Sequence, residues 1–179
     1  MSRTSMQLFA VAALAALATA VAQLGSGVGS SGQPPAELCA RTITVVETFS
    51  AAGLQVPMGI NATDYSTWPG STVGYNNDLV FGGSGMSNRT AGGILSMCFV
   101  QSASGDASYS YCIATATFSM GSITFQGPFP DDVDSVFVSA VVGGTGIFNG
   151  ATGSAKVTVL TAGTQWKYKF TLMSKPACM

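Results

Sequence analysis

The chain has 179 residues, a formal net charge of −1, 47% hydrophobic residues and only 8% charged residues. This length fits one domain, and so small a net charge provides no basic surface that could hold nucleic acid. The sequence contains no histidine, which excludes histidine-based catalytic triads and the usual imidazole metal sites. We therefore expect no metal and no cofactor, and any chemistry falls to carboxylates, tyrosine, lysine, cysteine and amides.

The first segment is predicted to be an export signal. Arg3 supplies a positive charge, an apolar run follows it, and Ala20-Val21-Ala22 forms a small-residue cleavage site. The run is too short to span a bilayer comfortably, and no second run of that length follows. We expect a secreted, extracellular protein (in the apoplast or cell wall if the organism has one) with no membrane attachment after cleavage. The expected parts are a signal peptide (1–22), a flexible Gly/Ser/Pro leader (23–38) and one folded domain (39–179).

Four cysteines in an exported chain favour disulfides. Cys39 opens the expected domain and Cys178 almost closes it, so a bond between them would join the two chain ends. Cys98 and Cys112 lie at equal distances on either side of Gly105. If Gly105 is the tip of a hairpin, the two cysteines face each other, and they either form a bond, which we prefer, or remain a buried thiol pair.

Two tripeptides match the acceptor sequence for N-glycosylation. They are Asn61-Ala62-Thr63 and Asn88-Arg89-Thr90. Because the chain is expected to be exported, we predict that Asn61 and Asn88 are surface sites open to this modification.

From Arg41 onward, two-residue alternation of apolar and polar side chains dominates and helical periodicity is hard to find. Eight short strands separated by glycine-rich turns indicate a sandwich or a closed barrel. The expected bond between the chain ends favours closure, which gives an all-β, eight-stranded antiparallel up-and-down barrel. A barrel of this size is filled by side chains or holds one small ligand. The predicted strands are 41–49, 72–81, 90–101, 108–118, 122–126, 135–142, 154–160 and 164–173.

One glycine-rich segment superficially matches a phosphate-binding loop. This segment, Gly143-Gly144-Thr145-Gly146, lies between strands, precedes no helix and lacks the lysine that such a loop requires. We therefore predict a tight turn or a bulge at this position.

Two polar residues interrupt apolar strand faces. Glu47 follows Ile43 and Val45 at strand spacing, and Asn77 lies between Tyr75 and Leu79 on one face. A carboxylate that points inward loses hydration, which raises its pKa unless a donor holds it. Glu47 and Asn77 are therefore the predicted catalytic residues, and the alternative is that Glu47 faces a loop and Asn77 binds backbone.

Two glycine-containing segments resemble a known family. Gly121–Phe129 (GSITFQGPF) resembles a strand and turn of allene oxide cyclases, and Val141–Gly150 (VVGGTGIFNG) is similar to both allene oxide cyclases and dirigent proteins. With 75–82 and 90–93, the resemblance covers roughly residues 42–172. It implies an eight-stranded antiparallel barrel, usually a homotrimer, with a central apolar cavity.

The resemblance to the cyclases implies roles for single residues. Glu47 matches a first-strand glutamate near the reacting centre, Asn77 matches an asparagine that helps to hold a water over an epoxide oxygen, and Pro57 lies near a cavity proline. This chain departs from the pattern where it has Phe49 in place of a second asparagine and Leu95 in place of a cavity cysteine. The cyclases are also plastid proteins, whereas this chain carries an export signal.

Dirigent proteins fit the expected export and terminal disulfide better. They steer the coupling of phenoxy radicals that a separate oxidase makes. Their first-strand His-Asp pair is replaced here by Val46-Glu47, and one of their arginines by Thr152. Asp132 and Asp134 could place carboxylates at a strand mouth, although a solvated loop is the preferred interpretation.

The preferred function is therefore a dirigent-like barrel that binds a small hydrophobic or phenolic intermediate and steers its coupling or cyclisation. The first alternative is an isomerase that acts on an unstable fatty-acid epoxide, and the second is a secreted wall or interaction protein without catalysis. Whether the protein is an enzyme stays open at this point. The predicted cavity residues are Tyr75, Tyr111, Phe125, Trp166, Phe170, Phe49 and Pro57.

Overall fold

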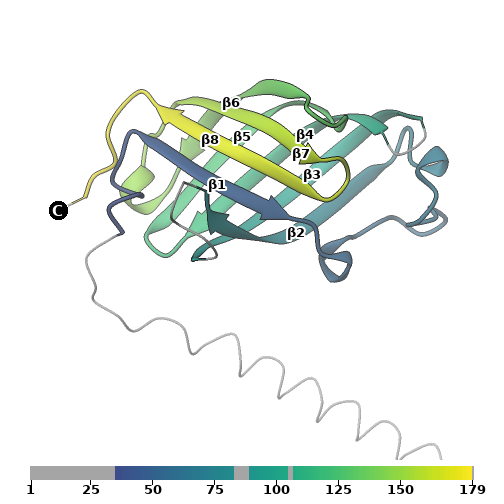
Figure 1. The fold of residues 1–179 in the computed structure, drawn as a ribbon, viewed down its shortest axis with the longest axis horizontal. Helices are drawn as coiled ribbons and strands as arrows, with labels where there is room; N and C mark the ends of the chain where they lie inside the picture. Colours follow the sequence, from purple (N-terminus) through teal and green to yellow (C-terminus); the bar gives the residue numbers. More distant parts are fainter. Residues whose placement is uncertain (1–34, 83–88, 105–106, 179) are drawn as a thin grey trace, which may run out of the picture. The chain divides into compact units, whose positions relative to one another are not determined.

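The computed structural model describes residues 35–82, 89–104 and 107–178, and these form a closed antiparallel barrel. The strands follow one another around the barrel in chain order (Figure 1), so the predicted fold class is confirmed. The predicted signal peptide, most of the leader and Asn88 lie outside the described residues. The elements are β1 Thr42–Thr48, η2 Ala51–Gly53, η3 Tyr65–Thr67, β2 Thr72–Phe81, β3 Thr90–Ser104, β4 Ala107–Phe118, β5 Gly121–Pro130, β6 Val136–Gly144, η4 Gly146–Phe148, β7 Gly153–Thr161 and β8 Gln165–Leu172.

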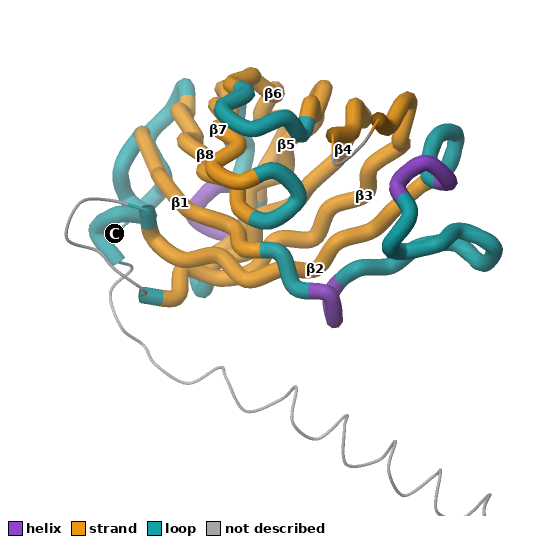
Figure 2. Tube along the Cα trace, turned by 45° about the vertical axis from the view of Figure 1, so that its right-hand side comes forward, coloured by secondary structure: helices purple, strands orange, loops and turns teal. Residues whose placement is uncertain are grey.

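The pairing of β1 with β8 closes the barrel. The two strands pair antiparallel from Thr42 opposite Thr171 to Thr48 opposite Gln165. Figure 2 shows β1 lying between β2 and β8, with no open edge on either side of it. A closed sheet leaves no unpaired strand edge, and this arrangement excludes the sandwich.

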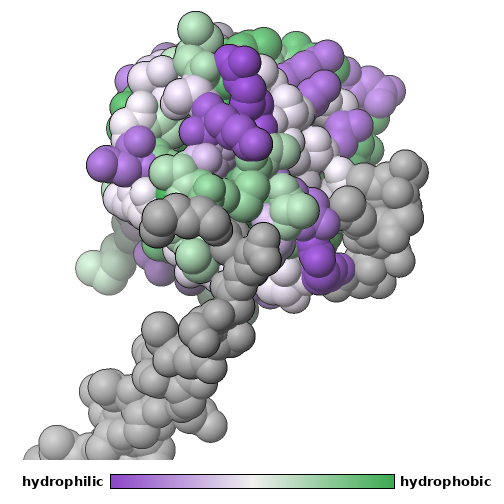
Figure 3. All heavy atoms as spheres, turned by 90° about the vertical axis from the view of Figure 1, so that its left-hand side faces the viewer, coloured by the Kyte–Doolittle hydropathy of each residue, from purple (hydrophilic) through white to green (hydrophobic). Residues whose placement is uncertain are grey.

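Buried residues form two clusters inside the barrel. The larger cluster occupies most of the interior and includes Ile43, Phe125 and Phe170. The smaller cluster contains Trp68, from the long connection between β1 and β2, together with the two cysteines that join β3 and β4. In Figure 3, which views the barrel from the end where the chain finishes, hydrophobic and hydrophilic residues are mixed over the visible surface.

Both predicted disulfides are present. Cys39 and Cys178 lie 5.7 Å apart between Cα atoms, and Cys98 and Cys112 lie 4.0 Å apart. Cys98 is directly opposite Cys112 because the register of β3 and β4 shifts at Gln101, which forms a bulge between the hairpin turn and the cysteines. The alternative of a buried thiol pair is therefore wrong.

The glycine segment at the end of β6 forms a bulge and a tight turn, as predicted. The register of β5 and β6 shifts where Phe125 opposes Val141 and Thr124 opposes Gly143. Gly146 has a φ of +59°, and a Cβ placed on it would lie 2.1 Å from the carbonyl oxygen of Met120. Glycine is thus required here by backbone conformation and by close approach of another strand connection.

Removing the two disulfides should destabilise the barrel unequally. The Cys39–Cys178 bond closes a sequence separation of 139 residues and the Cys98–Cys112 bond one of 14 residues. If the bonds act mainly by restricting the unfolded chain, the double variant Cys39→Ala/Cys178→Ala should lose about 5 kcal/mol of unfolding free energy, and Cys98→Ala/Cys112→Ala about 3 kcal/mol. Denaturant titration of both variants measures the difference, and a larger loss in the second variant would contradict the expectation.

Candidate functional site

A hollow lies inside the barrel, at the end from which the connection between β1 and β2 emerges. Its cavity volume is about 40 Å³. The empty space reaches about 540 Å³ when the solvent at the open mouth is included. The residues that line the hollow are Glu47, Tyr75, Ser96, Cys98, Ser108, Ser110, Cys112, Ala114, Phe125, Phe129, Asp131, Ser139, Trp166 and Tyr168.

Glu47 points into this hollow from β1. Its side chain is 3% exposed, and both of its oxygens accept hydrogen bonds. The Asn77 amide donates to Oε1 at 2.6 Å, and the Tyr168 hydroxyl donates to Oε2 at 2.5 Å. Asn77 in turn accepts a hydrogen bond from the backbone N–H of Ser50 at 2.9 Å. The inward orientation predicted for Glu47 is therefore confirmed, whereas the alternative that it faces a loop is wrong.

Burial controls the ionisation of this group. The loss of hydration raises the pKa of Glu47 above its usual 4.5, and the hydrogen bonds from Asn77 and Tyr168 offset only part of the increase. Burial also raises the pKa of Tyr168, and the negative charge of Glu47 raises it further. The tyrosine therefore stays protonated and available as a hydrogen-bond donor over the physiological range.

A second buried carboxyl group, Asp131, lines the hollow and escaped the sequence analysis. Its Oδ1 accepts a hydrogen bond from the indole N–H of Trp166 at 2.7 Å, and its Oδ2 accepts one from the backbone N–H of Gly163 at 3.0 Å. Burial raises the pKa of Asp131, against the lowering effect of these two donors. The neighbouring Asp132 and Asp134, which the sequence analysis considered, are exposed.

Aromatic side chains from β2, β5 and β8 line part of the hollow. Phe125, Trp166 and Tyr75 line it as predicted. Phe170 is buried beneath the hollow, in edge-to-face contact with Phe125 at 5.3 Å between ring centroids, and does not line it. Phe49 packs against Tyr75 at 6.4 Å between ring centroids and lies at the edge of the site.

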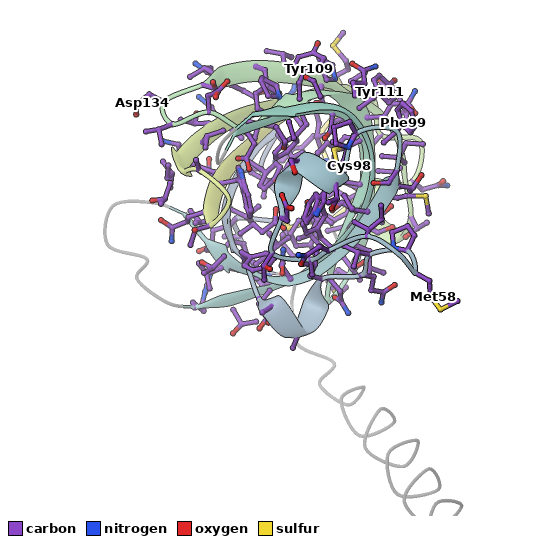
Figure 4. All side chains as sticks on the ribbon, turned by 90° about the vertical axis from the view of Figure 1, so that its right-hand side faces the viewer. Met58, Cys98, Phe99, Tyr109, Tyr111 and Asp134 are labelled. Carbon is purple, nitrogen blue, oxygen red and sulfur yellow. A yellow bond between two sulfur atoms is a disulfide. The ribbon has the colours of Figure 1, made fainter. Side chains whose placement is uncertain are left out.

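The prediction that Tyr111 and Pro57 line the cavity is wrong. Tyr111 is 43% exposed and lies outside the barrel, and Pro57 is exposed in the connection between β1 and β2. Figure 4 looks along the barrel and shows Cys98 inside the ring of strands, whereas Tyr109, Tyr111 and Phe99 lie outside it. Between Ser108 and Ala114 of β4 the large side chains face outward and the small ones face the interior, so the choice of Tyr111 selected the wrong face.

Small and polar side chains line the rest of the hollow. Four serines, the Cys98–Cys112 disulfide and Ala114 line the hollow from β3, β4 and β6. No lysine or arginine is among the residues that line it in the described part of the chain. The hollow therefore presents acceptors, hydroxyl groups and two carboxyl groups, without a compensating cation. The four serines are Ser96, Ser108, Ser110 and Ser139.

Of the two predicted glycosylation sites, only Asn61 lies in the described part of the chain. It is exposed, and its Oδ1 accepts hydrogen bonds from the backbone N–H and the hydroxyl of Thr63. The Asn61 side chain therefore lies at the surface, as predicted. No helix among the described residues is long and apolar enough to cross a membrane.

Comparisons with known proteins identify the fold. No protein-family model matches the chain, and no curated protein matches it. A solved structure of a pyocyanin demethylase is similar, with a TM-score of 0.54 and 20% identity over 74% of this chain and 99% of that chain. Two pterocarpan synthase dirigent proteins are also similar, each with 15% identity over 72% of this chain; their TM-scores are 0.55 and 0.54, and 89% and 84% of their chains are covered. At this identity the similarity shows the fold alone, which is the dirigent-like barrel.

The raised pKa of Glu47 predicts a specific pH dependence of stability. Because the folded protein holds this proton more tightly than the unfolded chain does, its contribution to stability is complete below the usual pKa of 4.5. That contribution is lost as the pH rises through the raised folded-state pKa, with a slope of at most about 1.4 kcal/mol per pH unit. Glu47→Gln should flatten this loss because a glutamine side chain does not titrate. The variant should keep the hydrogen bond to Tyr168, since the tyrosine hydroxyl can accept as well as donate one.

Denaturant titrations between pH 4 and 9 check this expectation. Glu37→Gln is the matched control, because the hydrogen bond from Arg89 lowers the pKa of Glu37. The contribution of Glu37 to stability is lost as the pH falls, whereas that of Glu47 is lost as the pH rises. The contribution of Glu37 is also small, because its ion pair with Arg89 is exposed. An unchanged pH profile in Glu47→Gln would contradict the assignment.

Proposed function

We propose that the protein is a secreted dirigent-like barrel that binds a small aromatic or phenolic intermediate and steers the stereochemistry of its coupling or cyclisation. The observation that carries this proposal is the hollow itself, which is lined by aromatic rings, small polar side chains and two buried carboxyl groups. The two disulfides support an oxidising, extracellular location. We also expect, from the resemblance, a homotrimer and a separate oxidase that supplies the intermediate.

The proposed steering depends on shape and hydrogen bonding. The rings of Phe125 and Trp166 offer surfaces for stacking, and Glu47 and Asp131 offer oxygens to a phenolic hydroxyl. A carboxyl group accepts hydrogen bonds when it is ionised and can also donate one when it is protonated. A preference of about 1.4 kcal/mol between two bound arrangements is enough for a tenfold ratio of products.

The hollow is too small for the proposed ligand unless side chains move. A space of about 40 Å³ does not admit a phenolic ring while every side chain keeps its position. Tyr75 and Phe129 line the hollow and are half-buried. We therefore expect these two side chains to move when the ligand enters.

The second candidate is an isomerase that acts on a fatty-acid epoxide. The inward positions of Glu47 and Asn77, which contact each other at 2.6 Å, favour it. Two features place it second. The Asn77 side chain already bonds Glu47 and the backbone of Ser50, and the lining lacks a cation to balance a fatty-acid carboxylate. The third candidate, a wall or interaction protein without catalysis, requires that the hollow binds no ligand.

Product analysis separates these candidates. The disulfide-bonded protein is added to coniferyl alcohol and laccase, and chiral chromatography measures the ratio of the coupled enantiomers. We expect an excess of at least about threefold for one enantiomer, which corresponds to less than 1 kcal/mol. Ser96→Phe should remove the excess because its ring occupies the hollow, whereas Thr117→Phe adds the same ring on the outer face of β4 and should leave the excess intact.

Each alternative has a distinct outcome in the same series. Conversion of an allene oxide by the protein alone, lost in Glu47→Gln, would identify the isomerase. A racemic product, together with unchanged tryptophan fluorescence on titration with phenols and fatty acids, would favour the barrel without catalysis and would overturn the proposed function.

A further inference from the structure

The two carboxyl groups of the interior hollow have no positively charged partner. Glu47 and Asp131 both line the hollow, and no lysine or arginine in the described part of the chain lines it with them. The groups that hold them are all neutral, namely an amide and a hydroxyl at Glu47, and an indole and a backbone N–H at Asp131. A buried carboxylate is costly unless a positive charge pairs with it. Among the described residues, the protein therefore supplies no counter-charge of its own for this pair.

Trp166 lies between the two carboxyl groups. It is directly opposite Glu47 in the pairing of β1 with β8, and its indole N–H donates to Asp131 at 2.7 Å. Burial raises the pKa of Glu47 most, and the charge of Asp131 raises it further, so the two groups are close enough to interact. A single positive charge placed near the Trp166 ring would thus be attracted by both of them.

Two buried serine hydroxyls line the same hollow. Ser110 and Ser139 are each 4% exposed, and neither side chain forms a hydrogen bond with another described residue. Gly127 leaves room for the second of them, since a Cβ at Gly127 would lie 2.8 Å from the Ser139 Oγ. Buried polar groups normally have partners, because an unmade hydrogen bond is costly. These two hydroxyls therefore indicate a ligand that brings a polar group into the hollow.

The polar groups of the hollow act mainly as hydrogen-bond acceptors. The Tyr168 hydroxyl and the Trp166 indole N–H are donors, but Glu47 and Asp131 already use them. The lining then presents carboxylate oxygens, hydroxyl groups and the faces of aromatic rings to a ligand. An ammonium group has three N–H donors and no acceptor, and the face of an aromatic ring attracts a cation. Both properties complement this lining.

We propose that the ligand of this hollow is an aromatic amine in its protonated form, an arylalkylammonium ion. Its ammonium group donates to Glu47, to Asp131 and to the buried serines, and its ring lies against the aromatic side chains of the lining. This inference rests on the proposed function in one respect, since Tyr75 and Phe129 must move to admit any ring. It specifies the charge of the ligand, which the proposed function leaves open, and it disfavours anionic ligands.

Calorimetric titration of the disulfide-bonded protein with three matched phenols tests this proposal. Tyramine, tyrosol and 4-hydroxyphenylacetate share one ring and a two-carbon side chain, which ends in an ammonium, a hydroxyl and a carboxylate group, respectively. At about pH 7.5, tyramine should bind at least about tenfold more tightly than tyrosol, and 4-hydroxyphenylacetate should bind most weakly. If tyrosol binds as tightly as tyramine, the proposal is overturned and the proposed function is not. If none of the three binds, both are overturned.

Two variants test the residues that carry the inference. Glu47→Gln should weaken tyramine at least about tenfold and change tyrosol by less than about twofold, because it removes a charge and keeps a hydrogen-bonding side chain. Glu37→Gln, which removes a carboxylate outside the hollow, is the matched control and should change neither. Ser139→Ala should weaken tyramine about threefold and leave the unfolding midpoint unchanged, since this hydroxyl bonds no described residue. Unaltered tyramine binding in folded Glu47→Gln would overturn the proposal.

The pH dependence of binding provides a second readout. The titratable side chains that line the hollow are Glu47 from β1, Tyr75 from β2, Asp131 after β5 and Tyr168 from β8, and the exposed Asp132 acts on Asp131 from outside. Burial raises the pKa of both carboxyl groups, so their negative charge develops as the pH rises. The affinity for tyramine should therefore increase at least about threefold from pH 5 to pH 8, with release of protons on binding, whereas that for tyrosol should not. A tyramine affinity that stays constant or falls would overturn the pairing with these carboxyl groups.

Discussion

Closure of the sheet between β1 and β8 is the constraint on which the interior site depends. The ladder between these strands places Glu47 opposite Trp166 and Val45 opposite Tyr168. Glu47 and Tyr168 are 121 residues apart in the chain and can share a hydrogen bond only because the first and last strands are neighbours. The Cys39–Cys178 bond joins the segments that flank the same two strands. The hydrogen bond between Glu47 and Tyr168 and the Cys39–Cys178 disulfide therefore both stabilise the pairing of β1 with β8.

Strand alternation predicted much of the fold, because each strand has one buried face and one solvent-facing face. It placed Glu47 and Asn77 inside, and it identified the inward residues of β8. It failed at the end of the fifth predicted strand, 122–126. In the structure β5 continues beyond Gln126 to Pro130 and retains its pairing with β4. The inward sequence of Ile123, Phe125 and Phe129 leads directly to Asp131, which an extended strand would have identified.

Alternation also does not say which face is inside. In β4 one face carries Tyr109, Tyr111 and Ile113 and the other carries Ser110, Cys112 and Ala114, and hydrophobicity alone selects the first. The cysteines carried the correct signal, since a disulfide between two neighbouring strands fixes which side chains share a face. The equal spacing of Cys98 and Cys112 from Gly105 was not by itself sufficient to place them opposite each other. The Cys98–Cys112 pairing depends on the bulge at Gln101, which no spacing of residues in the sequence reveals.

The small residues on one wall of the hollow have a consequence for how this barrel can diversify. Ser96 and Ala114 contact the interior space, whereas their backbones are held by ladders that do not depend on side-chain size. Exchanging such residues for others a few atoms larger or smaller would reshape the chamber while the architecture stays intact. Under the proposed function, the shape of the binding site is thus largely uncoupled from the interactions that fold the barrel, and few substitutions suffice to change it.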